Sequence, residues 1–159
     1  MKVVIIGGVA GGATAAARLR RIDESAEIII FERSGYVSYA NCGLPYYIGG
    51  EIKRRSSLTL QTPESFASRF NIDVRVNSEV TKIDRAAKKV YVRTPRGEYS
   101  ESYDKLIYCP GAKPIMPSGG GERFFTLRTV EDTFAIDDFI KNNSPRTAVV
   151  CGGGFIGLE

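Results

Sequence analysis

The chain contains no histidine. This absence excludes a histidine general base from these 159 residues and weakens any interpretation as a metal site. Its three cysteines (Cys42, Cys109 and Cys151) form neither a CxxC pair nor an even-numbered disulfide framework. No apolar run reaches the roughly 20 residues that a membrane-spanning helix needs, and no run rich in lysine or arginine marks a nucleic-acid arm. We therefore expect a cytoplasmic protein without a membrane or nucleic-acid partner.

Hydrophobic residues make up 43% of the chain, which is enough for a packed core. The net charge of +4 is mildly basic and could serve the phosphate groups of small ligands. The first third of the chain predicts a βαβ unit with a parallel sheet. A strand at Lys2–Ile6 ends in glycines, a helix covers Ala13–Ile22, and a second strand covers Glu27–Glu32.

The remaining segments predict further elements of an α/β fold. Residues 34–57 resemble a functional loop, and Pro63–Phe70 predicts a helix capped by Thr62. Between residues 72 and 109 the segments DVRV, EVTKID, KKVYVR and DKLIYC alternate, which predicts an antiparallel meander before a return to the parallel sheet. Glu131–Lys141 predicts a helix, and Thr147–Cys151 predicts a buried strand.

Two glycine-rich turns follow predicted strands. In a dinucleotide fold, glycines permit a tight turn, close approach of the backbone to pyrophosphate, and close packing of helix on strand. Gly7, Val9 and Gly12 occupy the three positions of the first turn, with Gly8, Ala10 and Gly11 between them. Glu32 follows at about the spacing of a ribose-binding carboxylate. The alternative is a turn that only packs the βαβ unit.

The second turn matches the dinucleotide pattern fully. Gly152, Gly154 and Gly157 follow the apolar segment AVVC. Two such turns in one chain indicate two dinucleotides, FAD at one and NAD(P) at the other.

Several stretches together are similar to the flavoprotein disulfide reductases that carry two dinucleotide-binding domains. They are residues 3–21, 28–33, 35–50, 103–114, 125–137 and 148–159. The block GYVSYANCGLPYYIGG is the most specific, and it resembles the single-cysteine branch, above all the coenzyme A disulfide and persulfide reductases. The resemblance implies FAD and NAD(P)H as cofactors and a homodimer. It also implies that this chain is an N-terminal part, with a Rossmann-like FAD-binding domain at residues 1–145. Residues 146–159 would then be the first strand and turn of an NAD(P)-binding domain.

The resemblance also implies which residues bind ligands. For FAD these are Gly7, Gly8, Val9, Ala10, Gly11, Gly12, Glu32, Arg33, Asn41, Val80, Pro110, Gly111 and Ala112. For NAD(P) they are Gly152, Gly154 and Gly157, and for a coenzyme A substrate they are Thr14, Arg18, Arg21, Ser38 and Asn41. The alternatives are an ordinary turn at Pro110 and a solvated basic helix end at Arg18 and Arg21. A substrate-binding lysine of the family is not matched, because Phe70 stands at its position.

Cys42 is the expected redox residue, because the resemblance places the catalytic sulfur in its motif. The alternative is a buried structural cysteine. Two-cysteine reductases carry a second cysteine five residues earlier, where this chain has Val37. One sulfur would therefore cycle with an external sulfur, as a mixed disulfide or persulfide, or as a sulfenic acid. Cys109 and Cys151 end apolar strands and are expected to be small core residues.

Three functions remain open from the sequence. The first is reduction of coenzyme A disulfide or a related persulfide. The second is an NADH oxidase or peroxidase, but those relatives carry a histidine where this chain has Ala10. The third is a truncated FAD-binding module without activity of its own.

Overall fold

A computed structural model describes residues 1–116 and 120–158. These residues form two units. The sheet unit comprises Met1–Tyr39 and Thr59–Ala112, and the helical unit comprises Ala40–Leu58 together with the chain from Lys113 onward. Glu159, which ends the predicted second-domain segment, lies outside the described residues. None of the helices within the described residues is long and apolar enough to cross a membrane.

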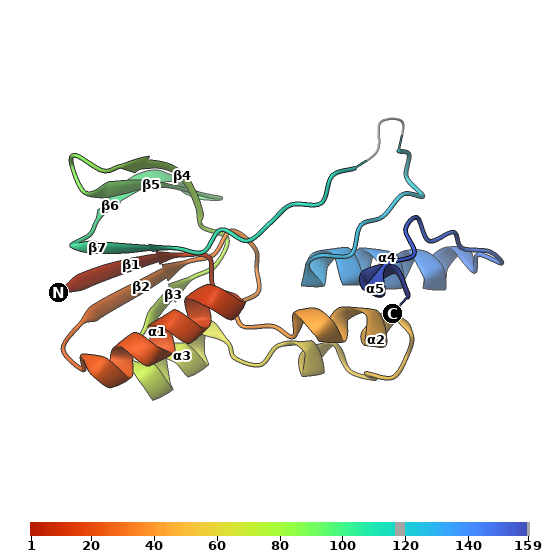
Figure 1. Cartoon of the computed structure of the whole chain (residues 1–159), viewed down its shortest axis with the longest axis horizontal. Coiled ribbons are helices and arrows are strands. Elements are labelled where there is room, and N and C mark those ends of the chain that lie inside the picture. The colour runs from red at the N-terminus through yellow and green to blue at the C-terminus, as the bar shows by residue number, and fades with distance from the viewer. Residues whose placement is uncertain (117–119, 159) are drawn as a thin grey trace. The chain divides into compact units, whose positions relative to one another are not determined.

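The sheet unit is built on four parallel strands in the order β3-β2-β1-β7. Their bounds are Lys2–Ile6 for β1, Glu27–Phe31 for β2, Asp73–Arg75 for β3 and Lys105–Tyr108 for β7. Helices α1 (Ala10–Ile22) and α3 (Pro63–Phe70) cover one face of this sheet, as Figure 1 shows. The other face carries an antiparallel sheet of β4 (Glu79–Asp84), β5 (Lys89–Thr94) and β6 (Gly97–Ser102).

The apolar runs of β1 and β2 are continuous because both of their faces are buried. Alternate residues point to opposite layers. Val3, Ile5, Ile28 and Ile30 pack with the helices, and Val4, Ile6, Ile29 and Phe31 pack with Val90 and Val92 of the meander. The predicted fold class, a parallel sheet with helices and a three-stranded antiparallel meander, is confirmed.

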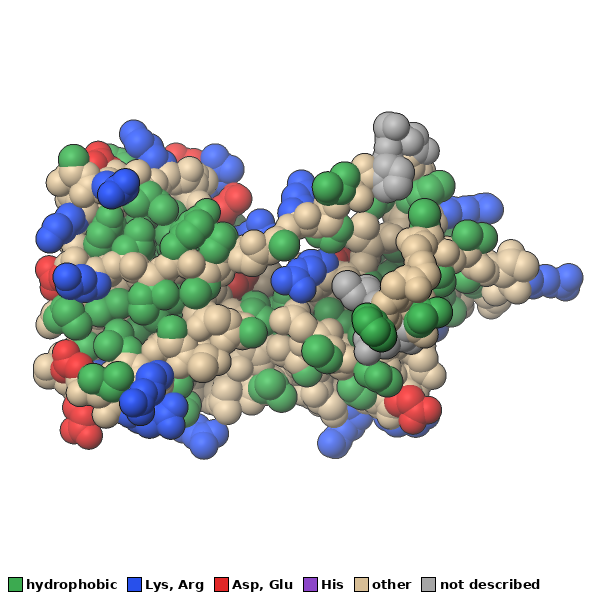
Figure 2. All heavy atoms as spheres, in the orientation of Figure 1, with side chains coloured by type: hydrophobic (Ala, Val, Ile, Leu, Met, Phe, Trp, Pro, Cys, Tyr) green, Lys and Arg blue, Asp and Glu red, His purple; other side chains and the backbone are tan. Residues whose placement is uncertain are grey.

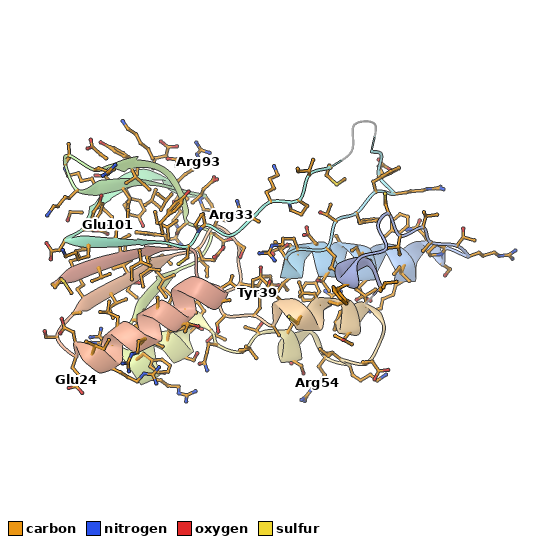
Figure 3. The ribbon with its side chains drawn as sticks, viewed as in Figure 1. Glu24, Arg33, Tyr39, Arg54, Arg93 and Glu101 are labelled. Atoms are coloured by element: carbon orange, nitrogen blue, oxygen red, sulfur yellow. The ribbon has the colours of Figure 1, made fainter. Side chains whose placement is uncertain are left out.

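Glu101 on β6 ties the meander to the parallel sheet and is labelled in Figure 3. Its carboxylate accepts hydrogen bonds from Lys2 Nζ of β1 and from Arg75 Nη1 of β3, each at 2.7 Å. The charges that join the two layers thus come from three different strands.

The boundaries of several elements differ from the sequence prediction. Helix α1 begins at Ala10 and not at Ala13, and α4 covers Val130–Asn143. The segment DVR joins the parallel sheet as β3, so the third meander strand is Gly97–Ser102, which alternation did not mark. The Thr62 cap of α3 is confirmed, since Thr62 Oγ1 accepts a hydrogen bond from the Ser65 amide.

The helical unit contains short elements around one longer helix. They are the 3₁₀ turns η1 (Asn41–Gly43) and η2 (Arg55–Leu58), and the helices α2 (Leu44–Ile48), α4 and α5 (Phe155–Leu158). The predicted strand at Thr147–Cys151 was wrong: no strand is assigned there, and Val149 is 94% exposed. A strand is completed by hydrogen bonds to a neighbouring strand, and none within the described residues pairs with this segment.

Candidate functional site

The first glycine turn connects β1 to α1 and leaves no room for side chains. Gly7 has a left-handed φ of +92°, and a Cβ there would lie 2.0 Å from the carbonyl oxygen of Cys109. A Cβ on Gly12 would lie 1.8 Å from the carbonyl oxygen of Gly7. Val9, the exception to the glycine pattern, has a φ of −99°, which any residue adopts. The turn therefore needs glycine at its two ends and tolerates valine between them.

Glu32 holds this turn through hydrogen bonds to backbone amides. Its side chain is 6% exposed, and its carboxylate oxygens accept hydrogen bonds from the amides of Gly8 at 2.8 Å and Ser34 at 2.9 Å. Sequence reasoning assigned Glu32 only to a ribose. The structure adds a role in holding the turn, because each buried donor needs an acceptor.

A cavity of about 260 Å³ opens beside the first turn, entirely within the sheet unit. Five residues predicted to bind FAD line it: Gly7, Glu32, Arg33, Val80 and Pro110. In Figure 3, Arg33 lies at the end of the parallel sheet where the cavity opens. The rest of the wall was missed by sequence reasoning and consists of Ile6, Phe31, Ser78, Glu79, Thr81, Lys82, Ile83 and Tyr108. Ile6, Phe31 and Tyr108 end strands of the parallel sheet, and the other residues reach the turn through β4 and the residue before it.

The other residues predicted to bind FAD lie outside the lining of this cavity. Gly8 and Gly12 are buried in the turn, and Ala10 and Gly11 are exposed at the start of α1. Gly111 has a left-handed φ of +69°, which explains why glycine follows Pro110. Ala112 is exposed, and Asn41 belongs to the helical unit.

The exposed side of α1 carries three of the predicted substrate residues. Thr14, Arg18 and Arg21 are all exposed and are spaced four and three residues apart, so they share one face of the helix. Lys and Arg side chains gather over α1 and α3 in Figure 2. Arg20 is not free to bind a ligand in this way, because its guanidinium donates to three backbone carbonyls. These belong to Phe70 and Asn71 at the end of α3 and to Glu24 after α1.

Ser38 adopts a left-handed conformation with φ of +48°. Its amide donates to the carbonyl of Gly8 at 2.9 Å, and its carbonyl accepts from the amide of Leu60 at 2.9 Å. Val37 beside it is 1% exposed, and its Cγ2 lies 2.9 Å from where a Cβ on Gly8 would stand. The position that holds a second cysteine in two-cysteine reductases is therefore a packed apolar site here.

Cys42 is exposed within η1, so the alternative of a buried structural cysteine was wrong. Cys109 is half-buried at the end of β7 and Cys151 is exposed, which corrects the expectation that both are core residues. Cys151 follows exposed residues that form no strand.

The second glycine turn repeats the backbone geometry of the first. Gly152 has a φ of +116°, and a Cβ on Gly157 would lie 2.0 Å from the carbonyl oxygen of Gly152. Gly154, unlike Gly157, has room for a side chain, since a Cβ there would meet no atom of the described residues within 4 Å. The turn is thus present without the sheet that a dinucleotide site requires.

Comparisons with known proteins agree on one family. The chain is 44% identical to a coenzyme A disulfide reductase of Staphylococcus aureus (strain JH9), over 99% of this chain and 36% of that protein. Reduced CoADR-RHD of Bacillus anthracis superposes with a TM-score of 0.94 at 53% identity, over 99% of this chain and 29% of that one. An NAD-dependent persulfide reductase from A. fulgidus gives a TM-score of 0.85 at 35% identity, over 90% and 28%.

The chain therefore spans about a third of the length of these relatives. The family model described as pyridine nucleotide-disulphide oxidoreductase matches residues 1–159. FAD and NAD(P)H are the cofactors of that family. This chain belongs to the pyridine nucleotide-disulphide oxidoreductase family.

Proposed function

We propose that this chain is the FAD-binding part of an NAD(P)H-dependent reductase that reduces coenzyme A disulfide, or a related persulfide, through Cys42. The observation that carries the proposal is an exposed thiol at Cys42 with a buried valine, and no second cysteine, at position 37. A second redox sulfur at the usual spacing is absent, so the disulfide partner must come from the substrate. The similarity to coenzyme A disulfide and persulfide reductases supports this choice of substrate.

The first glycine turn fits the pyrophosphate of FAD. The carbonyls of Cys109 and Gly7 leave no space for a Cβ at Gly7 or Gly12, so only glycines let the chain turn this tightly from β1 into α1. The first N–H groups of α1 have no acceptor within the helix and favour an anion. Glu32 would also accept a hydrogen bond from a ribose hydroxyl, and Arg33, Val80 and Pro110 would complete the wall. Bound FAD would supply two-electron transfer from NAD(P)H to sulfur.

Cys42 would perform the sulfur chemistry. Its thiolate attacks one sulfur of the disulfide, forms a mixed disulfide and releases the first thiolate. Two electrons that originate from NAD(P)H then cleave the mixed disulfide. This step restores the Cys42 thiolate and releases the second thiol after it takes up a proton.

The exposed face of α1 would hold the phosphate groups of coenzyme A. Two guanidiniums, at Arg18 and Arg21, offer planar pairs of donors that match phosphate oxygens. Thr14, Ser38 and Asn41 are proposed as further substrate contacts. Residues 1–145 would form the FAD domain, and residues 146–159, with the Gly152, Gly154 and Gly157 turn, would begin the NAD(P) domain. The cytoplasmic location and the homodimer stay predictions.

The test uses the full-length protein that contains this chain. It should oxidise NAD(P)H when coenzyme A disulfide is added, and Cys42→Ser should reduce this turnover to background. The matched control, Cys109→Ser, changes a half-buried thiol and should keep the activity. Turnover that survives in the Cys42→Ser variant would contradict the proposal. Oxygen- or peroxide-dependent NADH consumption that ignores coenzyme A disulfide would instead favour an oxidase or peroxidase.

A further inference from the structure

The segment that carries Cys42 is too short to hold its own shape. Turn η1 has three residues and α2 has five, and neither has a side-chain cap. Isolated helices below about 12 residues are marginal in water. The conformation around Cys42 must therefore be set by contacts with other parts of the helical unit.

One set of contacts is apolar and lies under the segment. Leu44 and Leu58 are fully buried, and a Cβ on Gly43 would lie 3.2 Å from Ile52 Cδ1. The amide of Ala40 donates to the carbonyl of Leu58 at 2.8 Å, which closes the loop that contains Cys42. These contacts bury the side of the segment next to Cys42 and join its start to Leu58.

The second set joins α2 to α4, and these helices lie side by side (Figure 1). Tyr47 is the residue of α2 that makes the connection. Its ring packs edge-on against Phe134 with centroids 5.9 Å apart, and its hydroxyl donates to Asp137 Oδ2 at 3.2 Å. Phe134 and Asp137 are three residues apart, on one face of α4.

Asp137 is the centre of this connection. Its side chain is 13% exposed, although it belongs to a surface helix. Besides Tyr47, it accepts hydrogen bonds from Lys141 Nζ at 2.7 Å and Arg55 Nη2 at 3.4 Å. The hydrogen bond from Lys141, opposed in part by burial, and those from Tyr47 and Arg55 hold the pKa of Asp137 below its usual value.

Arg55 contacts Phe134, Tyr47 and Asp138 in addition to Asp137. Its guanidinium stacks on the Phe134 ring at 4.3 Å, Nε donates to the Tyr47 hydroxyl at 3.4 Å, and Nη2 also contacts Asp138. Asp138 is 54% exposed and has Arg55 as a partner, whereas Asp137 reaches both Arg55 and Tyr47. Both carboxylates therefore pair with Arg55, but only Asp137 also accepts the hydrogen bond from Tyr47 of α2.

We propose that Asp137, acting through Tyr47, is a positioning residue for Cys42. It fixes the rotation of α2, and with it the direction of the thiol in the turn before α2. This inference rests on the proposed function of Cys42 as the redox residue. Asp137 and Tyr47 take no part in bond formation.

The experiment compares Asp137→Ala with Asp138→Ala in the full-length, FAD-loaded protein. Both variants remove a carboxylate from Arg55, but only the first removes the acceptor of Tyr47. For Asp137→Ala we expect faster amide hydrogen exchange in the peptide covering residues 41–48. We also expect kcat with coenzyme A disulfide to fall about tenfold, the size of one lost hydrogen bond to a charged group, with KM for NAD(P)H unchanged. Asp138→Ala should stay within about twofold of the parent in both measurements.

Two further variants keep the test decisive. Asp137→Asn retains an oxygen acceptor for Tyr47 and should restore most of the lost kcat. Tyr47→Phe keeps the ring on Phe134 and should reproduce part of the Asp137→Ala effect, even if Asp137→Ala fails to fold. Equal effects of Asp137→Ala and Asp138→Ala, or a lower kcat without faster exchange at 41–48, would overturn the proposal. Hydrogen exchange does not depend on turnover, so failure of the Cys42 mechanism would be recognised separately.

Discussion

The two glycine turns have the same local geometry in different surroundings. In both, the first glycine has a positive φ and its carbonyl oxygen lies within 2.0 Å of where a Cβ on the last glycine would stand. The first turn is continuous with a paired strand, and the Gly7 amide donates to the Phe31 carbonyl of the next strand. The second turn follows exposed residues that form no strand.

The glycine turn depends on fewer residues than the cavity beside it. Glycines at the first and last positions suffice for the turn, because the conformation depends on neighbouring backbone atoms. The cavity needs more: β2 supplies Phe31, the residues after it supply Glu32 and Arg33, and the meander supplies Val80. The second turn has none of these surroundings within the described residues.

The largest expected change in stability comes from an alanine at the last glycine of a turn, tested in both turns. Gly12→Ala drives a Cβ to 1.8 Å from a carbonyl oxygen inside the sheet unit, and it should lower the free energy of unfolding by at least about 3 kcal/mol. Gly157→Ala creates the clash at 2.0 Å in an exposed four-residue helix and should change this free energy by less than about 0.5 kcal/mol. Urea unfolding of the 159-residue chain, followed by far-UV circular dichroism, measures both. Similar losses would show that the second turn is also part of a cooperative unit.

A smaller loss of stability should follow when the ion pairs that join the meander to the parallel sheet are weakened. Burial alone would raise the pKa of Glu101, but the hydrogen bonds from Lys2 and Arg75 hold it below the ordinary value of 4.5. A lowered pKa in the folded state means that the ion pairs stabilise the fold above the unfolded-state pKa. This stability is lost as pH falls through the folded-state pKa.

Glu101→Gln tests this link between the layers. At pH 7 it should lower the free energy of unfolding by about 1 kcal/mol, since the charges are only partly shielded from water. The difference from the parent chain should shrink as pH falls below 4.5 and through the lower folded-state pKa, because the carboxylate is protonated first in the unfolded chain and then in the folded one. Urea unfolding at a series of pH values gives the result, with Glu98→Gln, an exposed carboxylate on the same strand, as control. A difference that is constant with pH would contradict the role of the charge.

The smallest effect should come from giving the first turn the glycine that the second has. Val9→Gly creates the Gly-x-Gly-x-x-Gly pattern of residues 152–157 at residues 7–12. Glycine loses more chain entropy on folding but is favoured over valine at a helix N-cap, so the two effects oppose each other. We expect a change in unfolding free energy below about 0.5 kcal/mol and an unchanged affinity for FAD in the full-length protein. A large loss of either would mean that the Val9 side chain has a role that its φ of −99° does not require.

Sequence reasoning succeeded where the signal is local. The strand Lys2–Ile6, the first turn, the capped helix α3 and the exposed Cys42 motif each depend on adjacent residues. It failed where partners are distant in sequence. DVR was assigned to the meander because its alternation does not reveal that β2 is its parallel neighbour, and Glu32 was assigned to a ligand alone because its contact with Gly8 spans 24 residues.

The sequence by itself determined the family, the backbone of both glycine turns and the motif with one cysteine at Cys42, because each is a property of short runs of residues. Tertiary structure alone decided which residues line the cavity beside the first turn, that Val37 is buried and packed on Gly8, and that Asp137 reaches Tyr47 across 90 residues. The physical reason is that strand pairing, burial and charge networks draw their partners from distant parts of the chain. The segment Thr147–Cys151 was expected to be a strand from its own residues, but no strand of the described residues pairs with it.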